Sequence, residues 1–189
     1  DSRARLPLPK REAMTPQEQQ IYDRFVGPEV KSLAGLQGPY GIWLHNPKLA
    51  GLAQPLNAYL RYDTPLGPRL TELGILVAAR ELDNQFLWTS HEPNAIKEGL
   101  TPAIIEVVRG RKATTGLPER EEVIITLGRE LYAHRKPSPA LFAHARQVLG
   151  DVDLVNLVAL FGDYAAMVMV ADTFDIQLRP GQTPLLPIK

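Results

Sequence analysis

The sequence contains no cysteine among its 189 residues. This absence excludes disulfide bonds, thiolate metal sites and any reaction that a cysteine thiolate would carry out. It leaves the cellular compartment open, because many periplasmic proteins also lack cysteine.

The chain also lacks a net charge, since its 21 basic residues are matched by 21 acidic ones. Proteins that bind nucleic acids or anionic membranes usually present an excess of lysine and arginine. We therefore expect neither nucleic acid nor membrane among the partners. No signal peptide is recognised, and the chain starts at Asp1 instead of Met. Cytoplasm is the default expectation, with a processed export form left open.

Strand-like alternation of apolar and polar residues is missing as well. Apolar residues recur instead every three to four positions, which predicts an all-α fold. Capping residues, prolines and glycines indicate where the helices begin and end. The predicted helices cover residues 15–26, 46–61, 68–82, 84–98, 103–109, 118–134, 138–150 and 151–176, and the stretch 36–43, with two glycines and a proline, is predicted to be a loop.

These helices form one predicted domain, residues 15–178, between two extended arms. The N-terminal arm, residues 1–14, shows no periodicity. The C-terminal arm, residues 179–189, is rich in proline and carries apolar residues that we expect to pack on a neighbouring subunit. The last predicted helix is long enough to span a bilayer, but Asn156 and Asp163 inside it would be costly in lipid. It is therefore predicted to be a core or subunit-interface helix.

The residues with the clearest chemical potential lie between positions 68 and 100. Glu72 falls on an apolar helix, and a buried carboxylate needs a partner or loses its charge. His91, on the next predicted helix, is the expected partner, and Leu87 and Trp88 share its face at helical spacing. A buried Glu–His pair is typical of a proton-transfer site. It also occurs as a purely structural pair, so both interpretations stay open.

The same segment resembles a known family. The alkylhydroperoxidase D pattern E-x11-C-x2-C-x3-H is matched in spacing by Glu72, Asn84, Leu87 and His91. The residues that follow, Ala95 and Gly99-Leu100-Thr101, are similar to a run found in the wider carboxymuconolactone decarboxylase family. Asn84 and Leu87 stand where the pattern has cysteine, so thiol peroxidase chemistry is excluded. The resemblance is to a cysteine-free branch of the family and covers about residues 6–178.

This resemblance implies an alkylhydroperoxidase D-like helical bundle with two tandem pseudo-repeats. Residues 72–82 echo residues 121–131, which supports a duplicated unit, although only the first unit carries the Glu–Trp–His set. Helices this apolar exceed what one chain of this size can bury, so we expect a homo-oligomer. The resemblance suggests trimers, or hexamers built from them.

The resemblance also implies a reaction, namely decarboxylation or a proton shift in a small unsaturated lactone or carboxylate, without a cofactor. Histidine suits such proton transfer because its reference pKa is ~6.5. We expect His91 to act as general acid and base, Glu72 to orient it, and Trp88 to form an apolar wall that excludes water. The four histidines show no metal-binding spacing, and no metal is expected.

Other residues are candidates for binding the substrate. Asn84 and Leu87 would lie beside His91, and His45 could approach the pocket from a stretch rich in aromatic residues. A substrate carboxylate would need an arginine, for which Arg80 and Arg61 are candidates. The alternative is a non-catalytic oligomer that has lost the redox cysteines of the family and serves as a small-ligand-binding or scaffold protein.

Overall fold

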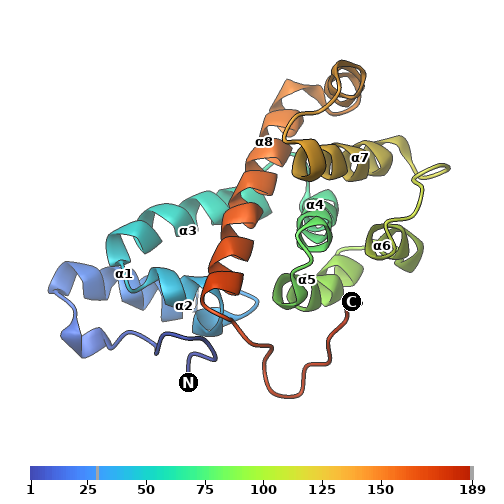
Figure 1. Ribbon diagram of the computed structural model, residues 1–189. Coiled ribbons are helices and arrows are strands. Elements are labelled where there is room, and N and C mark those ends of the chain that lie inside the picture. The colour runs from blue at the N-terminus through green and yellow to red at the C-terminus, as the bar shows by residue number, and fades with distance from the viewer. Residues whose placement is uncertain (29, 188–189) are drawn as a thin grey trace.

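Helices account for the regular structure of the computed structural model, which describes residues 1–28 and 30–187 (Figure 1). No strand occurs in these residues, which confirms the predicted all-α fold. In chain order the α-helices are α1 (Pro16–Val26), α2 (Pro39–Trp43), α3 (Pro47–Tyr62), α4 (Pro68–Glu81), α5 (Gln85–Lys97), α6 (Pro102–Arg109), α7 (Glu119–His134) and α8 (Pro139–Thr173). Two short 3-10 helices, η1 (Arg11–Ala13) and η2 (Gly35–Gln37), precede α1 and α2.

Side-chain caps set the beginnings of five of the described helices, and at four of them the sequence predicts the cap. The Thr15 hydroxyl accepts from the Glu18 amide, and the Glu18 carboxylate accepts from the Thr15 amide at 2.8 Å, which completes a capping box. Asn46, Thr101 and Ser138 cap α3, α6 and α8 in a similar way, each followed by proline at the first helical position. Proline fits there because its missing N–H would have no partner inside the helix.

The stretch 36–43 is not the loop that we predicted. It ends η2 and then forms α2, whose five residues are all buried. Tyr40 and Trp43 stack with ring centroids 5.6 Å apart, and Phe25 of α1 meets Tyr40 edge-on. Burial of these rings outweighs the glycines and the proline that favour a loop locally.

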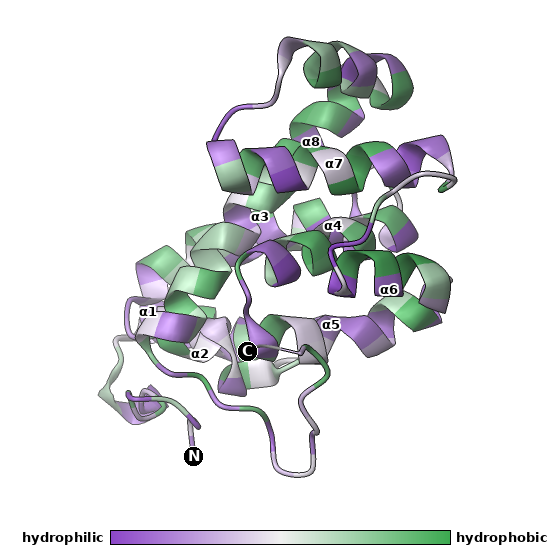
Figure 2. Ribbon diagram, turned by 45° about the vertical axis from the view of Figure 1, so that its right-hand side comes forward, coloured by the Kyte–Doolittle hydropathy of each residue, from purple (hydrophilic) through white to green (hydrophobic). Residues whose placement is uncertain are grey.

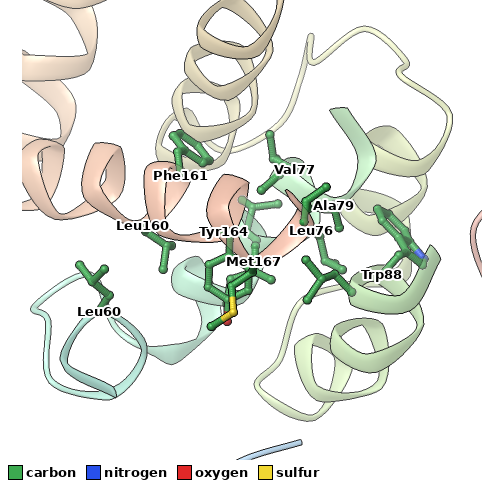
Figure 3. Packing of buried hydrophobic residues seen from close by; sticks show 14 of the residues in the cluster. Leu60, Leu76, Val77, Ala79, Trp88, Leu160, Phe161, Tyr164 and Met167 are labelled. Carbon is green, nitrogen blue, oxygen red and sulfur yellow. The ribbon is translucent and has the colours of Figure 1, made fainter. Parts of the chain in front are cut away.

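Helix α4 forms the centre of the core and packs against α5, α7 and α8 (Figures 1 and 3). Its side chains are almost all buried, and Leu73, Ile75, Leu76 and Val77 are fully so. The helices approach closely at Gly128 of α7, where an added Cβ would lie 2.5 Å from Val77 and 2.9 Å from Phe161. A glycine is therefore required at this crossing.

Helix α8 is the one described helix that is long and apolar enough to cross a membrane by length and composition. It changes direction at Gly150, whose φ of 76° separates the two helices that the sequence predicts there. One face, with Leu157, Leu160 and Phe161, lies in the core beside α4 and α7. The position agrees with the predicted core helix.

Apolar side chains remain exposed on the outer side of α8 and on the adjacent α3, and Figure 2 colours much of α8 as hydrophobic. The Tyr59 hydroxyl of α3 donates to Asn156 of α8 and links the two helices. We call this the α3/α8 apolar surface; it consists of Leu49, Leu52, Leu56, Val152, Val155, Val158 and Met169.

The two arms pack on their own chain. The Arg5 amide donates to Phe174 at 2.7 Å, so the N-terminal arm lies along the end of α8. In the C-terminal arm Leu186 is buried and exchanges two hydrogen bonds with the Gln85 side chain of α5. The arm that we expected on a neighbouring subunit therefore covers α5 of the same chain. Its last two residues, 188–189, lie outside the described part.

Replacement of Gly128 by alanine tests the close helix crossing. The added methyl group overpacks the core against Val77 and Phe161, which typically destabilises by about 1–3 kcal/mol. This loss opposes the ~1 kcal/mol that alanine gains over glycine inside a helix. We expect Gly128→Ala to lower the free energy of unfolding in urea. The control Gly51→Ala, whose Cβ meets Ile21 at 3.4 Å, should leave it unchanged or raise it.

Candidate active site

The structure brings Glu72 of α4 and His91 of α5 together. Nδ1 of His91 lies 2.8 Å from Oε2 of Glu72, and both side chains are nearly inaccessible to solvent. Helices α4 and α5 are joined by a tight reversal at Asp83, whose φ is 50°. After this reversal α5 packs back against α4, and His91 in the second turn of α5 lies opposite Glu72.

Further side chains contact the other oxygen of Glu72. The Asn94 amide donates to Oε1 at 2.8 Å, and Nη2 of Arg61 from α3 lies 3.5 Å from the same atom. Burial alone would raise the pKa of Glu72, but His91, Arg61 and Asn94 together hold that pKa below its usual value. Glu72 is therefore an ionised carboxylate in the core.

The imidazole of His91 is neutral near pH 7. Burial lowers its pKa, and the charge of Arg61 lowers it further, although Glu72 opposes both effects. An ionised carboxylate can only accept hydrogen bonds, so the proton of the neutral ring sits on Nδ1. Nε2 then carries a free lone pair and has no hydrogen-bond partner among residues 1–28 and 30–187. His91 is thus prepared to act as a base.

His91 borders a cavity that opens to solvent and lies between side chains of α2, α3, α5 and α8. Apolar atoms make up most of the surface that lines the cavity. The apolar side chains in this lining are Leu33, Ala34, Pro39, Phe86, Leu87 and Met167. The polar side chains that line it are Ser32, Tyr40, Asn57, Arg61, Ser90, His91 and Tyr164.

Two tyrosines line this cavity in different hydrogen-bonding states. The Tyr40 hydroxyl donates to Oδ1 of Asn57 at 2.6 Å, and the Asn57 amide donates to Asp163 at 2.6 Å. Tyr164 lies edge-on to His91, with ring centroids 5.4 Å apart, and its hydroxyl has no partner among the described residues. Burial raises the pKa of Tyr40 to about 12 and also raises that of Tyr164. Both stay protonated, but only Tyr164 has a proton to offer a ligand.

Four of the residues predicted from the sequence lie elsewhere. Asn84 caps α5 by accepting from the Leu87 amide at 2.9 Å and donates to Asp172. Trp88 is fully buried and its indole N–H donates to Glu92, so it lies away from Tyr164 and Met167 (Figure 3).

The remaining two are His45 and Arg80. Nε2 of the exposed His45 lies 2.9 Å from the Pro7 carbonyl, and Arg80 pairs with Asp83 at 2.6 Å. Neither residue borders the cavity, whereas Leu87 and Arg61 do.

The face of α5 that meets the cavity is rotated by about one residue from the predicted face. Leu87 and Trp88 are consecutive and point about 100° apart at 3.6 residues per turn, so only one of them can face the same space. Leu87 does, and Ser90, His91 and Asn94 continue that face. Asn94 follows His91 at i+3, which is the signal that could have revealed it.

Within the part of the chain that the structure describes, no three or more side chains of His, Cys, Asp or Glu gather as a metal site would require. Glu72 and His91 form a pair that is closed on its carboxylate side by Asn94 and Arg61. The arrangement can move a proton at Nε2 of His91.

A comparison with solved structures finds an uncharacterised peroxidase-related protein from Ralstonia eutropha, described as an alkylhydroperoxidase AhpD core. The TM-score is 0.74, and the match covers 96% of this chain and 97% of that one. The chain has the alkylhydroperoxidase D-like fold. Sequence identity is 17%, so the likeness concerns the fold alone. No model of a known protein family and no curated protein matches the chain.

Nuclear magnetic resonance of the histidine side chains tests the protonation state. In ¹H–¹⁵N spectra we expect His91 as the Nδ1–H tautomer, with a pKa below ~6.5. Arg61→Met should raise the pKa of His91 because a nearby positive charge is lost, and Glu72→Gln should lower it further. Arg80→Met, remote from the cavity, should leave it unchanged. An Nε2–H tautomer in the wild type would contradict the assignment.

Proposed function

We propose that this protein is an acid–base enzyme that decarboxylates a small unsaturated lactone or carboxylate, or shifts a proton within it, without a cofactor. One observation carries the proposal: a neutral histidine lines a largely apolar cavity while a buried carboxylate at Nδ1 fixes its tautomer and leaves Nε2 free. Such a histidine is a base at neutral pH because its lowered pKa keeps the ring unprotonated there. The alkylhydroperoxidase D-like fold supports the proposal.

In a proton shift, Nε2 of His91 removes a proton from a carbon next to a conjugated carbonyl group. The C–H bond breaks, its electron pair moves to the carbonyl oxygen, and His91 becomes an imidazolium. Glu72 stays ionised and stabilises this cation through the bond to Nδ1, 2.8 Å long. The imidazolium then returns the proton to another carbon of the same conjugated system, and the enzyme is unchanged.

In a decarboxylation, the bond that breaks joins the carboxylate to the carbon framework. Its electron pair again moves to the conjugated carbonyl oxygen, and CO2 leaves. The minor protonated form of His91 then supplies the proton that the carbon needs, and the ring regains a proton from water. The apolar wall of Leu87, Phe86 and Met167 favours this step, because a carboxylate loses its charge as CO2 forms.

The competing function is a binding protein without turnover. The convergence of Arg61, Tyr40, Tyr164 and Ser90 on the cavity beside His91 favours a ligand site over a scaffold with no ligand. Conversion of the ligand separates an enzyme from a binding protein, and the lack of cysteine excludes a thiol peroxidase in both cases.

We also propose that the protein forms homo-oligomers through the α3/α8 apolar surface. Exposed apolar patches of this kind usually mark interfaces in soluble proteins. Between Asp153 and Asp172 the outer side of α8 carries no charged residue other than the half-buried Asp163. A surface with so few charged residues suits a copy of itself better than a charged partner, and trimers or hexamers would place such patches against one another.

A substrate panel tests the proposed reaction. Wild-type protein is incubated with unsaturated lactones and β-keto acids while ultraviolet absorbance and CO2 release are followed. We expect turnover of at least one compound, and for a proton shift kcat/KM should fall as Nε2 becomes protonated, at a pH lower than the usual histidine pKa of ~6.5. His91→Ala should lower kcat/KM by about 10²–10⁴-fold, the usual contribution of a general base. His134→Ala, at the exposed end of α7, is the control and should be unaffected.

Sedimentation velocity tests the oligomer. Wild-type protein should sediment as a multiple of the 21.0 kDa chain at micromolar concentration. A lysine at Val155, in the middle of the α3/α8 apolar surface, should shift it to the monomer because a charge would be buried without a partner. Ile96→Lys places the same charge on an exposed residue of α5 and should keep the wild-type mass. A monomeric wild type would refute the proposal.

A further inference from the structure

Arg61 is a buried cation whose guanidinium lies over the Tyr62 ring and whose hydrogen bonds are long. Its side chain is 5% exposed, its Nη2 lies 3.5 Å from Glu72, and its Nη1 lies 3.5 Å from the Lys31 carbonyl. Both distances are at the limit of a hydrogen bond. Nε is buried and has no partner among residues 1–28 and 30–187. A buried guanidinium normally forms short, often bidentate bonds, so this one lacks a closely bonded anionic partner.

Glu72 does not supply that partner. Its Oε2 is bonded to His91 at 2.8 Å and its Oε1 to Asn94 at 2.8 Å, so the shorter and better bonds of the carboxylate go to other residues. Arg61 nevertheless lies at the edge of the cavity, in the same wall as His91 and Tyr164. The cation is therefore available to a ligand.

We propose that Arg61 and Tyr164 form an oxyanion site: they hold the ligand oxygen on which negative charge develops when His91 removes a proton. The inference rests on the proposed acid–base function and identifies two further catalytic residues for it. The Arg61 guanidinium supplies the compensating charge, and the Tyr164 hydroxyl donates a hydrogen bond to the same oxygen.

The placement of the base and the cation supports this role. Arg61 and His91 contact the two oxygens of one carboxylate and line the same cavity, so one small ligand can reach both side chains. An oxygen held by Arg61 and a carbon facing Nε2 of His91 can therefore belong to the same molecule. This placement fits the carbonyl oxygen of a carbon acid, which becomes the enolate oxygen when the proton leaves.

The two tyrosines divide the roles. The Tyr40 hydroxyl donates its hydrogen bond to Asn57, whose orientation is fixed because its amide donates to Asp163. The Tyr164 hydroxyl donates to no described residue, and Tyr164 is 2% exposed, so the hydroxyl can donate to a ligand with little competition from bulk water. Burial raises the pKa of Tyr164, so its hydroxyl stays protonated near neutral pH.

Absorbance titration with 4-nitrophenol tests the oxyanion site without a known substrate. This phenol is a planar single ring, and it absorbs visible light as the phenolate. At a pH one unit below its own pKa, we expect wild-type protein to bind it as the phenolate, with an affinity at least about tenfold above that for the neutral phenol. Nitrobenzene, which has no hydroxyl group, is the neutral control and should bind at least tenfold more weakly.

Variants test whether the preference for phenolate depends on Arg61 and Tyr164. Arg61→Met should abolish the preference for phenolate, Arg61→Lys should keep part of it because the charge remains, and Tyr164→Phe should reduce it several-fold. Arg80→Met, at an arginine away from the cavity, should bind as the wild type does. Circular dichroism and thermal melts establish that each variant is folded.

His91→Gln separates this inference from the proposed function. If the phenolate preference persists in His91→Gln and is lost in Arg61→Met, the oxyanion site is supported whether or not a turned-over substrate is found. If the preference is lost in His91→Gln and kept in Arg61→Met, the phenol has simply transferred its proton to His91, and the oxyanion site is refuted. Binding of the neutral phenol alone by the wild type would refute it too.

Discussion

The ionised carboxylate of Glu72 is the constraint on which the rest of the site depends. It sits in α4, the central helix of the core, where the effective penalty for an unpaired ion is several kcal/mol. That is a large part of the 5–15 kcal/mol that separates a typical folded domain from its unfolded chain. The compensating groups come from α3 and α5, namely Arg61, His91 and Asn94. Three helices must therefore meet in one register around this carboxylate.

The hydrogen bonds of the two Glu72 oxygens then determine which polar groups beside the cavity stay free for a ligand. Oε2 binds Nδ1 of His91 and so leaves Nε2 as the free nitrogen. Oε1 binds Asn94 and leaves Arg61 at a distance of 3.5 Å, too far for a strong ion pair. The same carboxylate thus leaves His91 with a free nitrogen and leaves Arg61 able to bind a further anion. Fixing polar groups in advance in this way is what lowers the reorganisation needed during a reaction.

The sequence could predict the parts of this arrangement that depend on local patterns. Capping residues gave most helix boundaries, and helical spacing paired Glu72 with His91. It could not predict α2, because burial of Tyr40 and Trp43 overrides glycine and proline signals that act locally. Nor could it predict Tyr164, which comes from a helix far along the chain and reaches the cavity only through tertiary packing. Trp88 was assigned to the wrong side of α5 because one residue of rotation separates it from Leu87.

Asn84 and Leu87 occupy the two positions that match the cysteines of the alkylhydroperoxidase D pattern, and both side chains are well accommodated. Asn84 makes two good hydrogen bonds at the start of α5, and Leu87 completes the apolar wall, so neither replacement leaves a defect. Among the side-chain atoms that are buried without partners in the described residues, Nε of Arg61 and the hydroxyl of Ser90 belong to residues that line the cavity. Each such group costs about 1–3 kcal/mol. An apolar residue at either position would avoid this cost, so their presence beside a free imidazole nitrogen favours a site for a polar ligand over the remnant of a lost site.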